Sequence, residues 1–179
     1  MRIFVISDTH FGHKALAAEY MSRPENFTGK TIENWNRLVN SDDLIIHLGD
    51  VALGGPKIWE ETISVLPGRK ILVSGNHDKK NLSWYMVNGF DFFCSSFNWN
   101  YFGLEIVFSH EPQLLGRFDL NIHGHLHLDR HREYETDQRH FLFSLENTGY
   151  QPLLLETIIS DWKKSVSGTK KLNELIGEK

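Results

Sequence analysis

The sequence predicts a layered α/β sandwich with mixed β-sheets, and three observations lead to this fold class. Its 179 residues are enough for one compact domain. Short apolar runs rich in β-branched and aromatic residues recur along the chain, as expected for strands buried on both faces. Helical patterns separate the first three runs, whereas later runs follow each other through turn residues. This order favours helices packed on mixed sheets.

Five apolar runs are predicted to be strands because each is short and is followed by glycine or polar residues. They are Ile3–Ile6, Leu44–Ile46, Ile71–Val73, Glu105–Phe108 and Leu120–Ile122. Between the first three, Thr31–Val39 places its apolar residues on one stripe, which predicts an amphipathic helix. Pro56 suits the first turn of a helix that runs to about Leu66, and Leu82–Val87 is predicted to be another helix.

The second half of the chain is richer in strand signals. Phe90–Phe108 has turn residues at Asn98–Asn100 and Gly103, which predicts antiparallel pairing. Two further strands and a final helix are predicted at Phe141–Leu145, Leu153–Leu155 and Glu156–Val166. We therefore expect a single domain over residues 1–166 and a polar, frayed tail over residues 167–179.

Composition and charge exclude several classes of protein. Hydrophobic residues make up 40% and charged residues 23%, which excludes disordered and collagen-like chains. The net charge of −4 leaves no overall basic surface, so we expect no obligatory nucleic-acid partner. The lone Cys94 excludes an internal disulfide and suits a reducing compartment. Without a signal peptide or a membrane-spanning stretch, the expected location is cytoplasmic and away from membranes.

The ten histidines need an explanation, because histidine serves both as a metal ligand and as an acid–base group. Many of them directly follow the predicted strands. The polar residues at these strand ends include Asp8, His10, Asp50, Asn76, His77, Asp78, His110, His125 and His127. Ligands of α/β sheets bind at the carboxyl ends of the strands. Mixed oxygen and imidazole ligands suit Mn, Fe, Zn, Co or Ni better than Ca.

Each motif alone also has a purely structural explanation. Asp8 and His10 share one side of an extended chain, but such a pair often occurs by chance. Gly49-Asp50 is an ordinary turn, and Gly75–Asp78 could be a capped helix start. Three histidines within His123–His127 are harder to explain by packing. The combination, in this order and always at strand ends, is what indicates a site.

In this order the motifs resemble those of the calcineurin-like metallophosphoesterase superfamily, whose pattern is D-x-H, G-D, G-N-H-D/E, a lone H and G-H-x-H. They stand here as Asp8/His10, Gly49-Asp50, Gly75–Asp78, His110 and Gly124–His127. Ser7–His13 is also similar to the start of small stand-alone bacterial and phage members. The second motif lacks the arginine of the protein phosphatases, and the chain is too short for a capping domain.

The resemblance implies a four-layer αββα sandwich, with two mixed sheets flanked by helices and two divalent metal ions at the strand ends. The first ion would have Asp8, His10 and His127 as ligands. The second would have Asn76, His110 and His125, and Asp50 would bridge the two ions. His77 would be a catalytic residue that faces the substrate phosphate, with Asp78 supporting its protonation or orientation.

Such a centre suits phosphoester hydrolysis on physical grounds. Two divalent ions bring +4 and two aspartates return −2, so the site attracts phosphate esters and can activate water. We expect a hydrolase that acts on phosphodiesters more than on monoesters, by attack of a metal-bridging hydroxide on phosphorus. Mn²⁺ is favoured, with Fe, Zn, Ni or Co as alternatives. The expected partner is a small phosphate ester, with nucleotides among the candidates; the oligomeric state is not predicted.

Two other functions stay open. The chain could be a non-catalytic, metal-binding scaffold of the same fold, although scaffolds tend to lose ligands or the equivalent of His77. Within the enzyme class it could be a nuclease, and the net charge of −4 counts mildly against that function.

The remaining histidines and cations have weaker signals. Candidate substrate contacts are His13, Arg23 and Arg117, each with a surface role as the alternative. His47 and His123 lie in apolar runs, which favours a place in the core or in support of the ligands. His131 and His140 lie in or near a charged stretch and are expected in a solvated loop.

Overall fold

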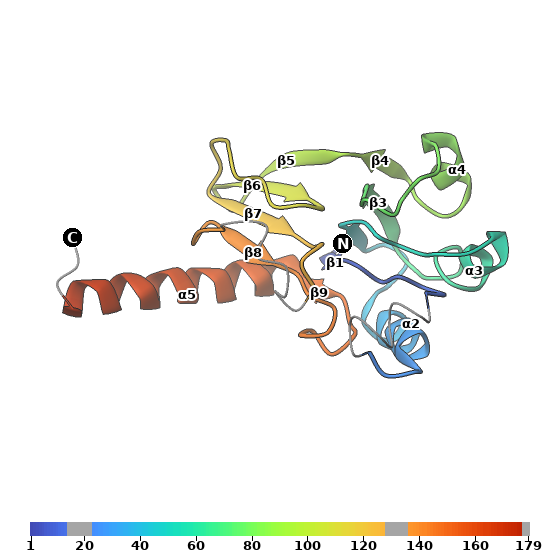
Figure 1. Ribbon diagram of the computed structural model, residues 1–179, viewed down its shortest axis with the longest axis horizontal. Helices are drawn as coiled ribbons and strands as arrows, with labels where there is room; N and C mark the ends of the chain where they lie inside the picture. The colour runs from blue at the N-terminus through green and yellow to red at the C-terminus, as the bar shows by residue number, and fades with distance from the viewer. Residues whose placement is uncertain (14–22, 128–135, 177–179) are drawn as a thin grey trace.

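Two mixed β-sheets with helices packed around them form the fold, which confirms the predicted α/β sandwich (Figure 1). The computed structural model describes residues 1–13, 23–127 and 136–176. The first sheet has the strand order β4-β3-β2-β1-β9 and the second has the order β5-β6-β7-β8. Helices α2 (Phe27–Leu38), α3 (Pro56–Glu61) and α4 (Leu82–Val87) lie around the first sheet.

The first sheet contains the parallel strands that carry most of the motifs. These strands are β1 (Ile3–Ile6), β2 (Leu44–His47), β3 (Arg69–Val73) and β4 (Phe92–Cys94). The short strand β9 (Leu153–Leu154) pairs antiparallel with β1 and makes the sheet mixed. Every residue of β1 is buried, as the uninterrupted apolar run predicts.

The second sheet combines one hairpin with two parallel strands. Its strands are β5 (Ser96–Tyr101), β6 (Leu104–Ser109), β7 (Leu120–His123) and β8 (His140–Leu142). The strands β5 and β6 pair antiparallel, whereas β6, β7 and β8 run parallel. Between the sheets, apolar side chains such as Ile6, Phe108 and Ile122 have no exposed surface and belong to one hydrophobic core.

Several predicted boundaries are wrong. The expected turn at Asn98–Asn100 lies inside β5, whose side chains alternate between half-buried and exposed; the chain turns at Phe102-Gly103, both with positive φ. Helix α3 ends at Glu61, short of Leu66. Strand β8 ends at Leu142, although the apolar residues that follow are buried.

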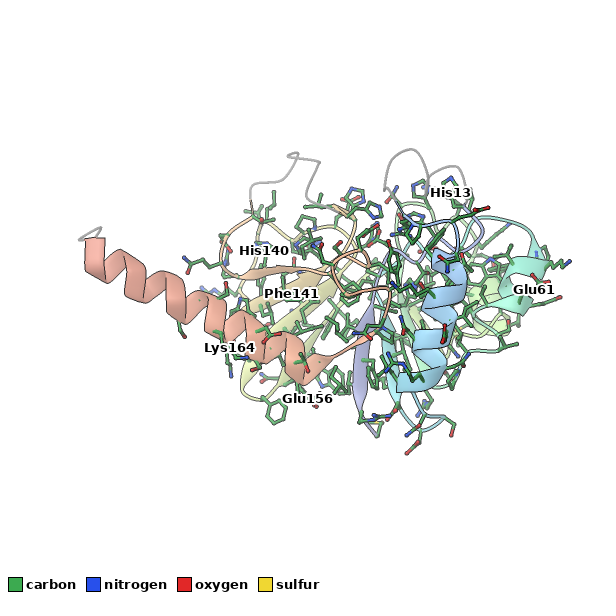
Figure 2. The ribbon with its side chains drawn as sticks, turned by 90° about the horizontal axis from the view of Figure 1, so that it is seen from below. His13, Glu61, His140, Phe141, Glu156 and Lys164 are labelled. Carbon is green, nitrogen blue, oxygen red and sulfur yellow. The ribbon has the colours of Figure 1, made fainter. Side chains whose placement is uncertain are left out.

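The last helix is longer than predicted. Helix α5 (Leu155–Ile176) continues past Val166, so no break separates the domain from the expected tail within the described residues. Its first turns contact β1 and β9, and its later part extends away from the sheets (Figures 1 and 2). Lysine, leucine and glutamate in this extension are good helix formers, which explains why the helix does not stop. Among the described residues, none of the helices is both long and apolar enough to cross a bilayer.

Candidate metal centre

The carboxyl ends of strands from both sheets meet at one edge of the sandwich. His13, near the end of the first motif, lies at this edge, whereas Glu156 in α5 lies at the opposite end of the sheets (Figure 2). Several contacts join the sheets here; among them, His125 N donates to Asp8 Oδ2 over 3.0 Å, and His110 Nδ1 donates to Leu48 O over 2.7 Å. The structure therefore brings the motifs together, as their positions after the strands predict.

Asp8, His10 and His127 form the first of two groups whose atoms could hold one metal ion. Asp8 Oδ1 lies 3.8 Å from His10 Nε2 and 3.7 Å from His127 Nε2. One ligand atom from each residue lies within 4.8 Å of the others. These three are the residues that the resemblance implies for the first ion.

Asp50 connects this group to the second one. Its Oδ2 atom lies 3.6 Å from His10 Nε2 and 3.5 Å from His110 Nε2. Asp8, Asp50 and His110 form the second group of possible ligands. Asn76 Oδ1 lies 2.9 Å from His110 Nε2 and 3.1 Å from His125 Nδ1, so all three residues expected around the second ion are adjacent.

The backbone at these residues has unusual conformations. Seven non-glycine residues in the described part of the chain have positive φ, and five of them are predicted ligands: Asp8, His10, Asp50, His125 and His127. Positive φ is costly for residues other than glycine and persists only where the surrounding structure imposes it. Such clusters are typical of functional sites, and no sequence signal predicts them.

Glycines let the loops approach each other closely. A Cβ atom at Gly124 would overlap Ser7 Oγ and Asp8 Oδ2, and one at Gly75 would overlap Asp50 Oδ1. The motif glycines thus bring the backbone of one loop against a carboxylate of another.

Burial and charge set the protonation of the cluster. Burial lowers the pKa of His10 well below its usual range, which keeps this imidazole neutral, the form that binds metals. Burial also disfavours the charged form of His110, but Asp50 and Asp8 outweigh it and raise the pKa of His110 to about 9. Burial disfavours ionisation of Asp50 as well, and His110 with His10 lowers the pKa of this carboxyl nonetheless.

Unpaired buried atoms show that the residues fit a metal ion. Asp8 Oδ1 and His10 Nε2 are buried and have no hydrogen-bond partner among the described residues. Buried polar atoms are normally paired, because leaving one unpaired costs about 1–3 kcal/mol. Both atoms point into the group formed by Asp8, His10 and His127, so a cation there would satisfy them.

Asp78 was expected to support the protonation or orientation of His77, but its observed contacts are with the backbone. Its carboxylate accepts hydrogen bonds from the backbone N–H groups of Asp50, Gly75 and Val51, at 2.8, 2.8 and 3.2 Å. These bonds tie the loop after β2 to the loop after β3 and are not contacts to the imidazole of His77. His77 is instead held through its own N–H, which donates to Asp50 Oδ1 over 2.8 Å.

Arg23 is buried next to the backbone of the first motif. Its side chain has no exposed surface, and it forms a 2.7 Å ion pair with Glu146. Its guanidinium also donates to the carbonyl oxygens of Asp8 and Thr9. A buried and fully engaged guanidinium does not fit the predicted role as a substrate contact, and its contacts are those of a residue that positions the first motif.

Glu146 is a site residue that the motifs do not contain. Its Oε1 atom lies 3.8 Å from His127 Nδ1, which is too far for a hydrogen bond but places a negative charge next to this imidazole. Ser144 Oγ donates to its other oxygen over 2.9 Å. The signal that could have found it is the one that marks the ligands, a polar residue directly after the apolar run Phe141–Leu145.

The remaining predicted residues, His13, Arg117 and His47, lie at the rim of the centre, at the surface and in the core, respectively. The imidazole of His13 lies 5.9 Å from that of His10 and 6.4 Å from that of His77, at the rim of the centre. Arg117 is exposed in the loop between β6 and β7. His47 is buried, with Nε2 2.9 Å from Thr9 Oγ1, and supports the first motif.

The prediction that His140 lies in a solvated loop is wrong. Its side chain is only 3% exposed, and its Nε2 donates to Gln113 O over 3.1 Å. The ring lies 5.8 Å from that of His123, which is also buried. His131 lies outside the described residues.

Comparisons with known proteins agree with this geometry. The family profile described as calcineurin-like phosphoesterase matches residues 1–171. The chain is 30% identical to the protein MJ1445 of Methanocaldococcus jannaschii over 172 residues, covering 88% of this chain and 89% of that protein. Over 80 residues it is 31% identical to the gene 66 protein of Mycobacterium phage D29, covering 43% of this chain and 40% of that protein. A crystal structure of the protein AQ665 from Aquifex aeolicus has a TM-score of 0.69 and 26% identity, covering 89% of this chain and 98% of that one.

The chain therefore belongs to the calcineurin-like phosphoesterase family. Membership makes it a metallophosphoesterase, a hydrolase of phosphoesters that uses divalent metals.

Proposed function

We propose that this protein is a phosphodiesterase with a dinuclear metal centre that acts on small phosphate esters. The observation that carries the proposal is the position of Asp50 Oδ2, within 3.5–3.9 Å of imidazole nitrogens of His10, His77 and His110. These three histidines come from three different loops, so one carboxylate joins both ligand groups and the proposed acid.

In this proposal Asp50 would be a ligand of both ions. Asp8, His10 and His127 would hold the first, and Asn76, His110 and His125 would hold the second. Mn²⁺ is the favoured metal, and Fe, Co, Ni or Zn are alternatives. When bound, the two ions supply Lewis acidity toward the phosphoryl oxygens and lower the pKa of water.

His77 has the position of a general acid. Its side chain is 43% exposed, the largest exposure among the histidines around Asp50, so a substrate can reach it. Its Nε2 atom lies 3.9 Å from Asp50 Oδ2 and can carry a proton to the leaving oxygen of the ester. Asp78 acts indirectly here, since its three bonds to backbone N–H groups hold the loops of Asp50 and His77 together.

The test is hydrolysis of bis-p-nitrophenyl phosphate by the metal-stripped protein with and without Mn²⁺. We expect turnover only with the metal and its loss on chelation. His77→Ala should lower kcat by about 10²–10⁴-fold while the protein keeps its metal, whereas Asp50→Asn should lose metal and activity together. Ser83→Ala, an exposed position on α4, serves as the control.

Absence of turnover with Mn²⁺, Fe²⁺, Co²⁺, Ni²⁺ and Zn²⁺ would favour the scaffold alternative. Full turnover by His77→Ala would overturn only the role of that histidine.

A further inference from the structure

A polar cavity of about 260 Å³ adjoins the candidate metal centre where β3 and β6 end and where the chain crosses from β4 to β5. It is lined by Ser74, Gly75, Asn76, Ser95, Ser109, His110, Glu111 and Gln113. We call it the serine cavity. Two of its residues, Asn76 and His110, are also proposed ligands of the second metal ion. A phosphoester held at the centre therefore has one of its substituents next to this cavity.

The lining residues define which substituent fits. Ser74, Ser95 and Gln113 offer hydrogen-bond donors and acceptors, and none of the eight lining residues is a lysine, an arginine or an aliphatic residue. Among the lining residues a second phosphate group would meet the carboxylate of Glu111 and would find no lysine or arginine. An aromatic base would find no apolar or aromatic surface to stack on except His110. Hydroxyl groups, which both donate and accept, match this lining.

The wall formed by the loop after β6 is held in place by a buried network. Asn121 has no exposed surface, and its amide donates to Ser109 Oγ over 2.9 Å while its Oδ1 accepts from Gln113 N over 2.8 Å. Ser109 Oγ in turn donates to Glu111 O over 2.7 Å. His140 Nε2 fixes the same wall through Gln113 O, so the buried histidine that the sequence left unexplained has a structural purpose here.

The facing wall is tied to the metal centre itself. Ser74 N donates to Cys94 O over 2.9 Å, which joins the end of β3 to the residue before Ser95. Gly75 N donates to Asp78 Oδ2, the carboxylate that also holds the loop of Asp50. A cavity with both walls fixed before binding loses little entropy when a ligand binds, which favours selective recognition.

We propose that the serine cavity binds the polyhydroxylated alcohol of the substrate, so that the preferred substrates are phosphodiesters of a small polyol or sugar. This inference rests on the proposed function and deepens it by naming the substrate class. Pockets for drug-sized ligands have about 300–1,000 Å³, so a cavity of this size takes a group of a few carbon atoms and hydroxyls. Esters whose second substituent carries another negative charge are disfavoured by Glu111.

The test compares two esters that differ only in hydroxyl groups. Both release p-nitrophenol, and the other substituent on phosphorus is either propyl or 2,3-dihydroxypropyl. With the Mn²⁺-loaded protein we expect kcat/KM to be about tenfold higher for the dihydroxypropyl ester, the gain that two net hydrogen bonds provide. Ser95→Ala and Glu111→Gln should each reduce this ratio severalfold, and Ser83→Ala should keep it.

Binding provides a second readout that does not depend on turnover. By isothermal titration calorimetry, 2,3-dihydroxypropyl phosphate should bind about tenfold more tightly than propyl phosphate, and Glu111→Gln should narrow the difference. A carboxyethyl ester should be the poorest of the three substrates and should improve in Glu111→Gln. Equal kcat/KM for the propyl and dihydroxypropyl esters would overturn the cavity assignment and leave the proposed function standing. If neither ester is hydrolysed with any metal, the proposed function fails and the cavity assignment falls with it.

Discussion

The ion pair between Arg23 and Glu146 offers the sharpest test of how the ligands are held in place. We consider Glu146→Gln, which keeps the shape of the side chain and removes its charge. In the native protein this carboxylate accepts from Arg23 at 2.7 Å, and its side chain is 7% exposed while that of Arg23 is fully buried. The substitution therefore leaves a buried guanidinium whose remaining described acceptors are the carbonyls of Asp8 and Thr9.

The size of the effect follows from this burial. Removing one partner of a buried ion pair typically costs 3–5 kcal/mol, because the other charge stays buried and uncompensated. Glutamine still accepts a hydrogen bond, so we expect the lower end, about 3 kcal/mol of the free energy of unfolding. For a chain of this size that corresponds to a fall in Tm of about 6–12 °C. Loss of the carboxylate behind His127 should also weaken Mn²⁺ binding about 10–100-fold.

Calorimetry on the metal-stripped protein measures both quantities, Tm by scanning and Mn²⁺ affinity by titration. The matched control is Glu61→Gln, whose 3.6 Å pair with Lys57 has side chains that are 58% and 83% exposed. That variant should change stability by less than about 0.5 kcal/mol and leave Mn²⁺ affinity unchanged. Replacing both Arg23 and Glu146 with methionine should restore much of the stability and not the affinity. Native Mn²⁺ affinity and native Tm in Glu146→Gln would refute the reasoning.

Two further predictions concern the backbone and the buried histidine. Gly124→Ala should abolish Mn²⁺ binding in titration calorimetry, because the new methyl group overlaps Ser7 Oγ and Asp8 Oδ2; native affinity would show that the two loops can separate without harm. Burial lowers the pKa of His47 to about 3, against 6.5 in the unfolded chain. Between these values the unfolded chain binds the extra proton, so stability should fall as the pH is lowered from 6.5, by up to about 1.4 kcal/mol per pH unit. Urea unfolding of the metal-stripped protein at several pH values measures how the free energy of unfolding changes with pH. In His47→Gln this change per pH unit should be smaller by the contribution of about one proton. An unchanged pH dependence would contradict the assigned burial effect.

Apolar patterning was sufficient to predict the buried strands of the fold. Strands such as Ile3–Ile6 are buried on all sides and therefore appear as uninterrupted apolar runs. Strand β5 lies at the edge of its sheet and is half exposed, so its asparagines gave the signal of a turn. The length of α5 was missed because the segment after Val166 is mostly polar and begins with Ser167 and Gly168, which are poor helix formers.

The residues of the candidate site could be predicted from the sequence, whereas their geometry could not. The motifs contain Asp8 and Asp50, but nothing in the sequence predicts that both have positive φ, because that conformation is imposed by contacts between loops. The partner of Arg23 is more than a hundred positions away in the sequence, and such a pairing leaves no local pattern. The same holds for His140 at the start of β8, whose hydrogen-bond partner Gln113 O lies in the loop after β6.

The central claim is that two groups of side chains bridged by Asp50 hold two divalent ions. Isothermal titration calorimetry of the metal-stripped protein with Mn²⁺ tests this claim most directly, because the measurement does not depend on choosing the right substrate. We predict about two ions bound per chain, and a loss of affinity at both positions in Asp50→Asn, since the bridging carboxylate serves both. A native titration curve in Asp50→Asn, or a protein that binds no Mn²⁺, Fe²⁺, Co²⁺, Ni²⁺ or Zn²⁺, would contradict it.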